Sequence, residues 1–408
     1  MGDILTIEEG IINPDMFYPV APYNSYENAE AKDHKFPRYA IQGLAKEFAD
    51  LHSGYLESPW AFWANSFLTC LGNLFADRFT LESQLRPQPR FYTVLLGESA
   101  DDRKSECIRQ SVSFFSEIFP EYPICRGVGS AEGLAEWLRS HCPSLLVFDE
   151  FKTFASKAMT GPSVLLSCVN TLFEENRYQN CTKGHSIQIN SAYLSILAAS
   201  TVQTYQRMWT PSFMDIGFIN RLWIVPGRAQ RRVSIPLSIP EREKAPLKKI
   251  LSFMFESVSR FVPPICLPIT PGAHDIFSDW YGRTSGSVFT KRLDTYGHRL
   301  MILFSINEGK AEVTPDIAER VVGLLEWQRG VRKEYDPIDA EGKIAKLEQL
   351  IRKGLAKGPL DKRTLQRQLH YERFGLSAWN TAMKNLEDAG EIVYDPKGKL
   401  YERKEENS

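Results

Sequence analysis

The sequence lacks the features that would place the protein in or across a membrane. None of its apolar stretches approaches the roughly 18 uninterrupted apolar residues that a membrane-spanning helix needs. Its start, MGDILTIEEG, contains neither the basic segment nor the apolar segment of a secretory signal peptide. We therefore expect a cytoplasmic protein that does not associate with membranes.

Cysteine pairs of the kind that bind metals or form disulfides are also lacking. The seven cysteines are odd in number and widely spaced, and no two of them form a C-x-x-C motif. This pattern argues against both a disulfide framework and a zinc knuckle. We expect each cysteine to be a small buried apolar residue.

Net charge is nearly absent as well. Lysine and arginine number 49 and aspartate and glutamate 50, so the formal net charge is −1. Nucleic-acid binding through an overall positive field is therefore excluded, and any such binding must rest on a local basic surface. Hydrophobic residues make up 43% and charged residues 24% of the 408, which excludes a disordered or fibrous chain.

The apolar pattern changes several times along the chain and predicts several parts, as the length also does. The first residues show no apolar period, whereas the next stretch has apolar residues at the helical spacing of three and four. The expected parts are an irregular arm at residues 1–35, a helical N-terminal region at 36–90, an α/β core at 91–235, a helical lid or accessory region at 236–336 and a small C-terminal domain at 343–404.

Two helices, separated by a break at Ser58 and Pro59, are expected in the helical N-terminal region. The second carries an aromatic stripe of Trp60, Trp63 and Phe67. Such a stripe is either a platform on which bases stack or a face packed against the next part of the chain. We predict the packed face.

Short β-rich apolar runs alternate with helical stretches between residues 91 and 227. The runs are FYTVLLG, LLVFDEF, AYLSILAAST and RLWIVPG. This alternation predicts a parallel sheet built from βαβ units, in which ligands bind at the carboxyl ends of the strands. The fold class that we expect is therefore α/β.

The run LLVFDE, which ends in Asp149 and Glu150, has the pattern of a buried strand followed by two carboxylates. This is the Walker B pattern of nucleotide hydrolases. In that role Asp149 would hold Mg²⁺, and the catalytic Glu150 would orient and deprotonate the attacking water. An ordinary strand that ends in a solvated turn has the same letters.

Earlier in the chain, VLLGESADDRKS places a loop between an apolar strand and a helix, where a phosphate-binding loop belongs. In that role Lys104 would contact the β and γ phosphates of ATP, and Ser105 would give its hydroxyl to Mg²⁺. Gly97, Ser99 and Arg103 complete the predicted cofactor-binding residues, with Arg103 as a second cation.

This loop departs from the usual G-x-x-x-x-G-K-[ST] pattern. Arg103 stands where the second glycine is expected, and Gly97 lies seven residues before Lys104 instead of six. Asp101 and Asp102 would weaken the binding of a polyanion unless they point outward. A decayed site that no longer hydrolyses nucleotide is the alternative.

Two further polar positions lie next to apolar runs. The run 194–199 is followed by Ser200 and Thr201, and Thr201 would sense the γ-phosphate or position the attacking water. Arg221, which precedes the run LWIVPG, is a candidate arginine finger for nucleotide bound to a neighbouring subunit. Strand termination and a surface ion pair would explain these residues equally simply.

Together, GESADDRKS, LLVFDEF, LSILAAST and GFINRLWIVPG make residues 36 to 335 resemble a family of RecA-like P-loop proteins of phages, plasmids and other mobile elements, often encoded beside or fused to primases. The resemblance implies a RecA-like P-loop NTPase core and an ATPase related to replicative helicases. It also implies assembly into a homo-oligomeric ring, with a primase or other replication partner. Family members usually carry threonine after the loop lysine, whereas this chain has Ser105.

Residues 343–404 predict three helices and then two short strands around Asp395 to Gly398, which is the order of a winged helix. From residue 344 onward this part holds 13 lysines and arginines against 8 acidic residues, so a basic surface is expected. It would hold DNA through phosphate contacts, with salt-sensitive affinity and little sequence information. The predicted contacts are Lys362, Arg363, Arg367, Lys384, Lys397 and Lys399.

Two functions remain open from the sequence. The first is an ATP-dependent, DNA-associated motor or switch of the helicase type, with a P-loop core, a helical lid and a C-terminal winged helix. The second is a non-catalytic DNA-binding adaptor that keeps the fold but has a degenerate nucleotide site. Only the first requires turnover of ATP.

Overall fold

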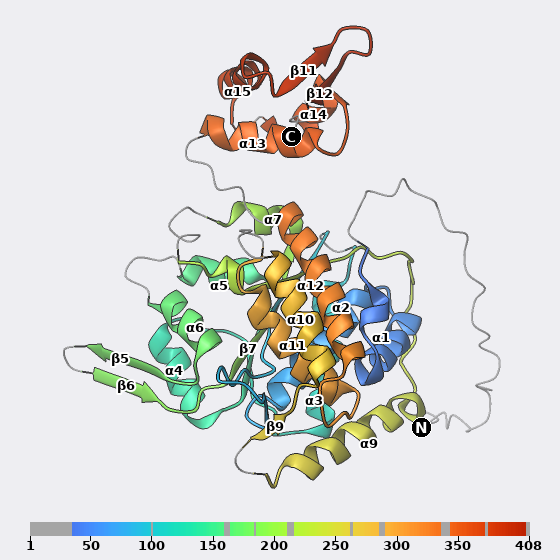
Figure 1. Ribbon diagram of the computed structural model, residues 1–408, viewed down its shortest axis with the longest axis vertical. Helices are drawn as coiled ribbons and strands as arrows, with labels where there is room; N and C mark the ends of the chain where they lie inside the picture. The colour runs from blue at the N-terminus through green and yellow to red at the C-terminus, as the bar shows by residue number, and fades with distance from the viewer. Residues whose placement is uncertain are drawn as a thin grey trace, which may run out of the picture.

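A five-stranded sheet forms the centre of the main part of the chain (Figure 1). The strands lie in the order β3, β4, β7, β2, β8 and run parallel. Their bounds are Ile124–Cys125 for β3, Ser144–Phe148 for β4, Leu194–Thr201 for β7, Tyr92–Gly97 for β2 and Trp223–Pro226 for β8. β2 and β4 are buried along their whole length, which is why they read as continuous apolar runs. The predicted α/β class with a parallel sheet is confirmed.

This architecture is that of a computed structural model. It describes residues 35–98, 101–158, 164–182, 185–209, 216–261, 264–284, 290–335, 343–371 and 374–404. The predicted N-terminal arm, residues 1–35, therefore lies outside the described residues except for its last position. Within these stretches, no helix is both long and apolar enough to cross a membrane.

Helices α2 and α3 cover one face of the sheet, and α1 packs against α2. Their bounds are Gly43–Tyr55 for α1, Trp60–Leu74 for α2 and Lys104–Ile118 for α3, and a short turn, η2 (Arg38–Ala40), precedes them. All of α2 is buried, and a 2.7 Å contact between the Thr69 and Thr93 hydroxyls joins it to β2. Trp60, Trp63 and Phe67 are at most 5% exposed, so the aromatic stripe is a packed face, as predicted.

The opposite face of the sheet meets α6, because the Tyr92 hydroxyl of β2 donates to a carbonyl of that helix at 2.9 Å. The helices of this region are α4 (Ala131–Ser140), α5 (Phe151–Ala158), α6 (Leu165–Glu174) and α7 (Val202–Arg207). Two buried arginines hold the end of α6. Arg90 donates to Leu172 O at 2.7 Å, and Arg299 donates to Phe173 O. The last carbonyls of a helix lack partners within it and carry partial negative charge, so guanidinium groups stabilise them.

A two-stranded antiparallel hairpin follows α6 and extends away from the sheet, at the left of Figure 1. Its strands are β5 (Tyr178–Thr182) and β6 (His185–Ile189). The sequence analysis did not predict this hairpin. Its strands, YQNCT and HSIQI, contain few apolar residues, and they pair with each other but with no strand of the central sheet.

The accessory region is helical, as predicted, and shares the core of the sheet. Its helices are α9 (Glu241–Val258), α10 (Pro271–Thr284), α11 (Leu293–Asn307) and α12 (Pro315–Tyr335), and a turn, η3 (Ile219–Arg221), comes before β8. A short strand, β9 (Ile265–Leu267), pairs in parallel with β1 (Phe79–Leu81). Buried apolar residues from Ala40 to Val331 belong to one continuous hydrophobic core.

The C-terminal module has a hydrophobic core of its own, centred on Leu347, Ile351, Leu365 and Trp379. Its elements are α13 (Lys343–Leu355), β10 (Leu360–Asp361), α14 (Lys362–Leu369), α15 (Leu376–Asp388), β11 (Ile392–Asp395) and β12 (Leu400–Arg403). The strands form an antiparallel sheet in the order β10, β12, β11. The predicted helices and the two last strands are present, and β10 is an addition that the sequence analysis missed.

The cysteines differ from expectation at two positions. Cys70, Cys107, Cys125 and Cys168 are buried and Cys142 is partly buried, whereas Cys181 and Cys266 are exposed. The expectation that every cysteine is buried was therefore wrong. Both exceptions lie in two-stranded ribbons, β5 with β6 and β1 with β9, where one side of a strand faces solvent.

Candidate functional site

The predicted phosphate loop and the predicted Walker B carboxylates lie at the same carboxyl edge of the sheet. β2 ends at Gly97, which pairs with Thr201 of β7, and β4 ends at Phe148, which pairs with Ala198 of β7. Neighbouring strands are about 4.8 Å apart, so β2 and β4 are about 10 Å apart at this edge. The sheet thus brings together two segments that are distant in the sequence.

Lys104 begins α3, and its side chain turns back onto the loop. Its Nζ donates to Gly97 O at 3.0 Å and to Glu98 O at 2.6 Å. The residue is 9% exposed, and burial holds the pKa of Lys104 below its ordinary value, with the charge of Asp102 opposing this shift. The two carbonyl oxygens keep the buried cation hydrogen-bonded. Ser105, in the first turn of α3, is exposed.

Asp102 points into the loop and not outward. Its carboxylate is buried and accepts the Glu98 amide at 2.5 Å and the Ala229 amide at 2.7 Å. A Cβ at Gly97 would lie 2.6 Å from Asp102 Oδ2, so a side chain there would force Asp102 to move. The glycine is therefore needed for the approach of this carboxylate, a reason that the sequence alone did not show.

The neighbouring charged residues of the loop are paired with other parts of the chain. Arg103 has a left-handed backbone, with φ of 46°, and its Nε donates to Glu57 Oε2 at 2.9 Å. Asp101 accepts from Arg232 at 2.8 Å in an exposed ion pair of the kind that contributes little to stability. Arg103, predicted as a second cation for the phosphates, thus contacts an acid. Ser99 lies outside the described residues.

Asp149 and Glu150 follow β4 and directly precede α5. Both side chains are exposed, and Glu150 O accepts the Thr153 amide at 3.0 Å as the helix begins. Among the residues that the structure describes, no group of three or more histidines, cysteines or acids gathers into a metal site. A divalent ion at this edge would therefore take further ligands from a nucleotide and from water, which is how Mg²⁺ is commonly held.

Thr201 ends β7, the strand that separates β2 from β4. Its hydroxyl caps α7 by accepting the Thr204 amide at 3.1 Å, and it donates to Thr204 Oγ1 at 2.8 Å. Helix capping alone accounts for a threonine at this place. Its predicted contact with a γ-phosphate or a water stays a prediction, for which its position between the two motifs is suitable.

Arg221 points into its own chain. Its guanidinium donates to Gly217 O at 2.9 Å and lies 3.4 Å from Glu174 Oε1, an oxygen that Arg292 also contacts at 2.8 Å. Burial, and then repulsion by Arg292, hold the pKa of Arg221 below its ordinary value. Reaching the nucleotide of a neighbouring subunit would require breaking these contacts. The arginine-finger role stays a prediction.

The six basic residues predicted to contact DNA are all exposed on the C-terminal module. Three belong to α14, one to α15 and two to the turn between β11 and β12; they are Lys362, Arg363 and Arg367, then Lys384, then Lys397 and Lys399. The carboxylate of Asp395 accepts the amides of the second and third residues of that turn and so orders it. The surface is therefore cationic and solvent-facing.

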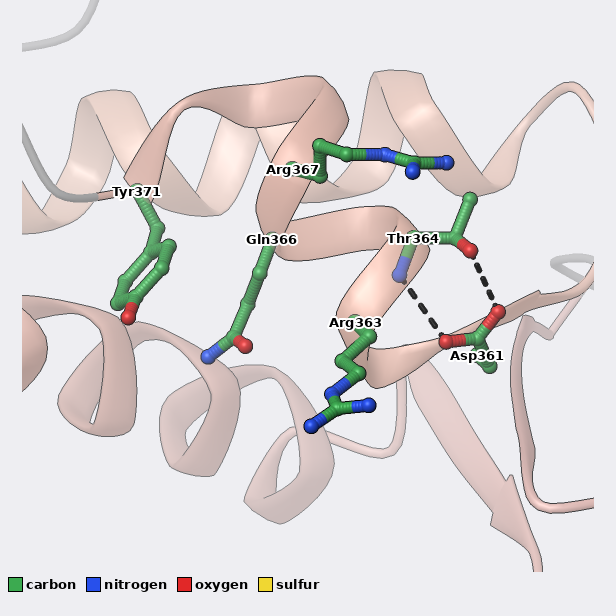
Figure 2. A pocket seen from close by; sticks show the side chains of 6 residues that line it. All are labelled: Asp361, Arg363, Thr364, Gln366, Arg367 and Tyr371. Atoms are coloured by element: carbon green, nitrogen blue, oxygen red, sulfur yellow. Dashed lines mark hydrogen bonds between the residues drawn. The ribbon is translucent and has the colours of Figure 1, made fainter.

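A hollow lies along α14, as Figure 2 shows. Its lining residues are Asp361, Arg363, Thr364, Gln366, Arg367 and Tyr371. Asp361 caps the helix by accepting the Thr364 amide at 3.0 Å and its hydroxyl at 2.6 Å. Sequence analysis named Arg363 and Arg367 but missed Gln366 and Tyr371. Tyr371 lies beyond the end of α14, where His370 has a left-handed backbone, so helical spacing could not have identified it.

Comparison of the chain with models of protein families and with curated proteins found no match in either case. The resemblance to RecA-like P-loop proteins thus depends on the sequence motifs. The function must be inferred from the geometry of the residues described above.

Proposed function

We propose that the protein is an ATP-dependent, DNA-associated motor or switch of the replicative-helicase type. The observation that carries this proposal is that the loop before Lys104 and the segment with Asp149 and Glu150 follow β2 and β4 at the same edge of a parallel sheet, with only β7 between these strands. A lysine at the start of a helix and an acidic pair beside it are what a nucleoside triphosphate with Mg²⁺ requires.

Each residue of this edge has a role in the proposal. Lys104 leaves its loop carbonyls and binds the phosphates. The Ser105 hydroxyl and the Asp149 carboxylate are oxygen ligands of the kind that Mg²⁺ prefers, and the ion would neutralise phosphate charge. Glu150 orients the attacking water and accepts its proton. Thr201 positions that water from the end of β7.

The C-terminal module supports the association with DNA. The order helix, strand, helix, helix, strand, strand is typical of a winged helix. Exposed cations on α14, on α15 and in the last turn would contact phosphates of the DNA backbone. Such contacts give affinity without sequence specificity, which suits a protein that acts along DNA.

One observation favours the second function, a non-catalytic DNA-binding adaptor. The Asp102 carboxylate bonds to the Glu98 amide inside the loop, where a phosphate would bind. The Asp102 carboxylate and a phosphate bound at the same amide would both be anions, and they would repel each other. A degenerate nucleotide site would show the same contact.

Turnover of ATP distinguishes these two functions. We expect the full chain with Mg²⁺ to release phosphate from ATP, and single-stranded DNA to raise the rate. Glu150→Gln should lower kcat by about 100-fold or more, because it removes the group that accepts the proton. Lys104→Ala should abolish nucleotide binding in addition to turnover. Phosphate release and nucleotide titration measure these effects.

Lys249→Ala is the control, because it removes an exposed lysine of α9 and should leave turnover unchanged. A wild-type rate no higher than that of Glu150→Gln would exclude the motor and leave the adaptor.

A further inference from the structure

The segment that follows β8, residues 227–233, runs across the phosphate loop, and we name it the strap. Its first amide, from Gly227, donates to Leu96 O of β2 at 2.9 Å. Further along, the Ala229 amide donates to Asp102, and the Val233 amide donates to Glu57 Oε1 at 2.5 Å. Glu57 is also the acid that pairs with Arg103. The strap is therefore held by the same acids that hold the loop.

Asp102 is the buried link between the loop and the strap. One oxygen of its buried carboxylate accepts the Glu98 amide, and the other accepts the Ala229 amide. Hydrogen bonds to a charged carboxylate are stronger than neutral ones, and they strengthen further when they are removed from water. Asp102 thus joins the loop to the strap through one buried side chain, in addition to the exposed pair of Asp101 with Arg232 and the bonds of Glu57 to both segments.

A bound phosphate would compete with Asp102 for the same donor. Backbone amides of a loop before a helix are the groups that hold phosphates, and Glu98 provides the first amide after β2. While the carboxylate accepts this amide, the amide is not available to a phosphate, and the negative charge of the carboxylate lies inside the loop. A phosphate that takes this amide must displace the carboxylate, because two anions cannot share the site at low energetic cost.

We propose that Asp102 is a positioning residue that a nucleotide displaces, so that binding of a triphosphate releases the strap. The inference rests on the proposed nucleotide site and adds its consequence. When Asp102 leaves the Glu98 amide, the Ala229 amide loses its acceptor as well. A bound nucleotide and an attached strap therefore exclude each other. Whether the strap is attached or released then depends on whether the site holds a nucleotide.

The release is confined to a short segment, because the chain is anchored again beyond the strap. At the start of α9, Lys244 and Lys248 contact Glu117 of α3 at 3.6 and 2.7 Å, and the Tyr55 hydroxyl donates to Glu243 at 2.7 Å. These contacts do not involve Asp102. The amides of Ala229 and of the strap residues near it are therefore the ones whose protection should change.

Amide hydrogen exchange of the full chain, with and without Mg²⁺ and a non-hydrolysable ATP analogue, tests the inference. We expect exchange at Ala229 to rise about tenfold or more on nucleotide binding, since a charge-assisted bond is lost. In Asp102→Asn only the side-chain oxygen can accept, so the Glu98 and Ala229 amides compete for one acceptor, and exchange at Ala229 without nucleotide should be faster than in the wild type. That variant should also bind the analogue more tightly, because no carboxylate competes for the Glu98 amide.

Asp275→Asn is the control, because it makes the same change at an exposed acid of α10, outside the loop and the strap. It should behave like the wild type in both measurements. Analogue binding that leaves the exchange at Ala229 unchanged would overturn the inference and leave the nucleotide site intact. If no variant binds the analogue, the proposed function fails and the inference fails with it. The wild-type measurement alone decides the matter if Asp102→Asn does not fold.

Discussion

At the scale of single residues, buried charges in this protein are held mainly by backbone groups. Lys104 donates to two loop carbonyls, Asp102 accepts two amides, and Arg90 and Arg299 donate to the end of α6. A buried charge is tolerated when its hydrogen bonds are made. A partner such as Ala229 for Asp102 is distant in the sequence, so sequence analysis does not identify it.

His52 is a buried titratable residue with a clear consequence for stability. Its ring packs between Phe48 and Trp63, with centroid distances of 3.8 and 5.0 Å, and Nδ1 lies 2.9 Å from Phe48 O. Because a carbonyl only accepts, Nδ1 carries the proton. Burial lowers the pKa of His52 to about 4, against the opposing effect of the Phe48 carbonyl.

This shift predicts a loss of stability in mild acid. Between pH 6.5 and about 4 the unfolded chain binds a proton at His52 that the folded chain does not, so stability falls as the pH falls through this window. From pH 7 to pH 5 the loss due to His52 should be about 2 kcal/mol. Denaturant unfolding of the wild type and of His52→Phe at both pH values measures it.

The quantity compared is the change in the free energy of unfolding between pH 7 and pH 5 in each protein. A packing cost of His52→Phe that does not depend on pH therefore cancels. The variant should lose about 2 kcal/mol less than the wild type on acidification. Equal losses in the two proteins would show that His52 does not titrate in this window.

At the scale of elements, α2 shows how a helix can be buried on every side. All of its residues are buried, including polar ones that bond to neighbours, such as Asn65 to Trp223 and Asn73 to Ser144. Helical spacing predicted α2 correctly because spacing is local. The polar residues on it gave no sign of burial, because their partners lie in the strands.

Close packing of α2 leads to a prediction for its glycine. A Cβ at Gly72 would lie 1.9 Å from Pro89 O, a backbone atom, so Gly72→Ala must displace the chain. We expect it to lower the free energy of unfolding by about 1–3 kcal/mol. Gly54→Ala in α1 is the control, since no atom lies within 4 Å of its Cβ, and it should stabilise the protein by about 0.5–1 kcal/mol.

Thermal or denaturant unfolding measures both changes. If the two alanine variants shift stability in the same direction, then contact with Pro89 does not determine the effect at Gly72.

At the scale of the whole molecule, the chain has two separate hydrophobic cores, and we propose a different function for the part that surrounds each. One core joins the sheet with the helices from α1 to α12, and the other lies within the C-terminal module. Lys357 of the module contacts Glu334, at the end of α12, at 2.9 Å. Nucleotide chemistry and DNA contact would thus be located on different parts of one chain.

The basic surface of α14 predicts a measurable salt dependence of DNA binding. Each phosphate contact contributes about 0.9 to the slope of log affinity against log salt. Replacing Arg363 and Arg367 by glutamine should therefore reduce this slope by about 2 and weaken binding to all sequences alike. Fluorescence anisotropy with labelled DNA of two unrelated sequences, over a range of salt concentrations, measures the slope.

The control removes two exposed cations from elsewhere, Lys249 and Arg260, again by glutamine. It makes the same change in net charge and should keep the slope. An equal reduction in both double variants would assign the effect to overall charge and contradict a specific role of α14.

The sequence alone determined several of the main elements. The α/β order, the ends of β2 and β4, the aromatic core face of α2 and the three helices of the C-terminal module all follow from local spacing and composition. Parallel strands have their carboxyl ends at one edge, so the placement of the loop before Lys104 at the same edge as Asp149 and Glu150 followed from the same local signals.

Only the tertiary structure decided which elements are neighbours and where charged side chains point. The strand order, the pairing of β5 with β6 and the addition of β10 depend on contacts between distant segments. The inward turn of Asp102 and the pairing of Arg103 with Glu57 do so as well. Local periodicity reports how each segment buries its own apolar face, whereas the partner of a polar group is set by the segment that packs against it.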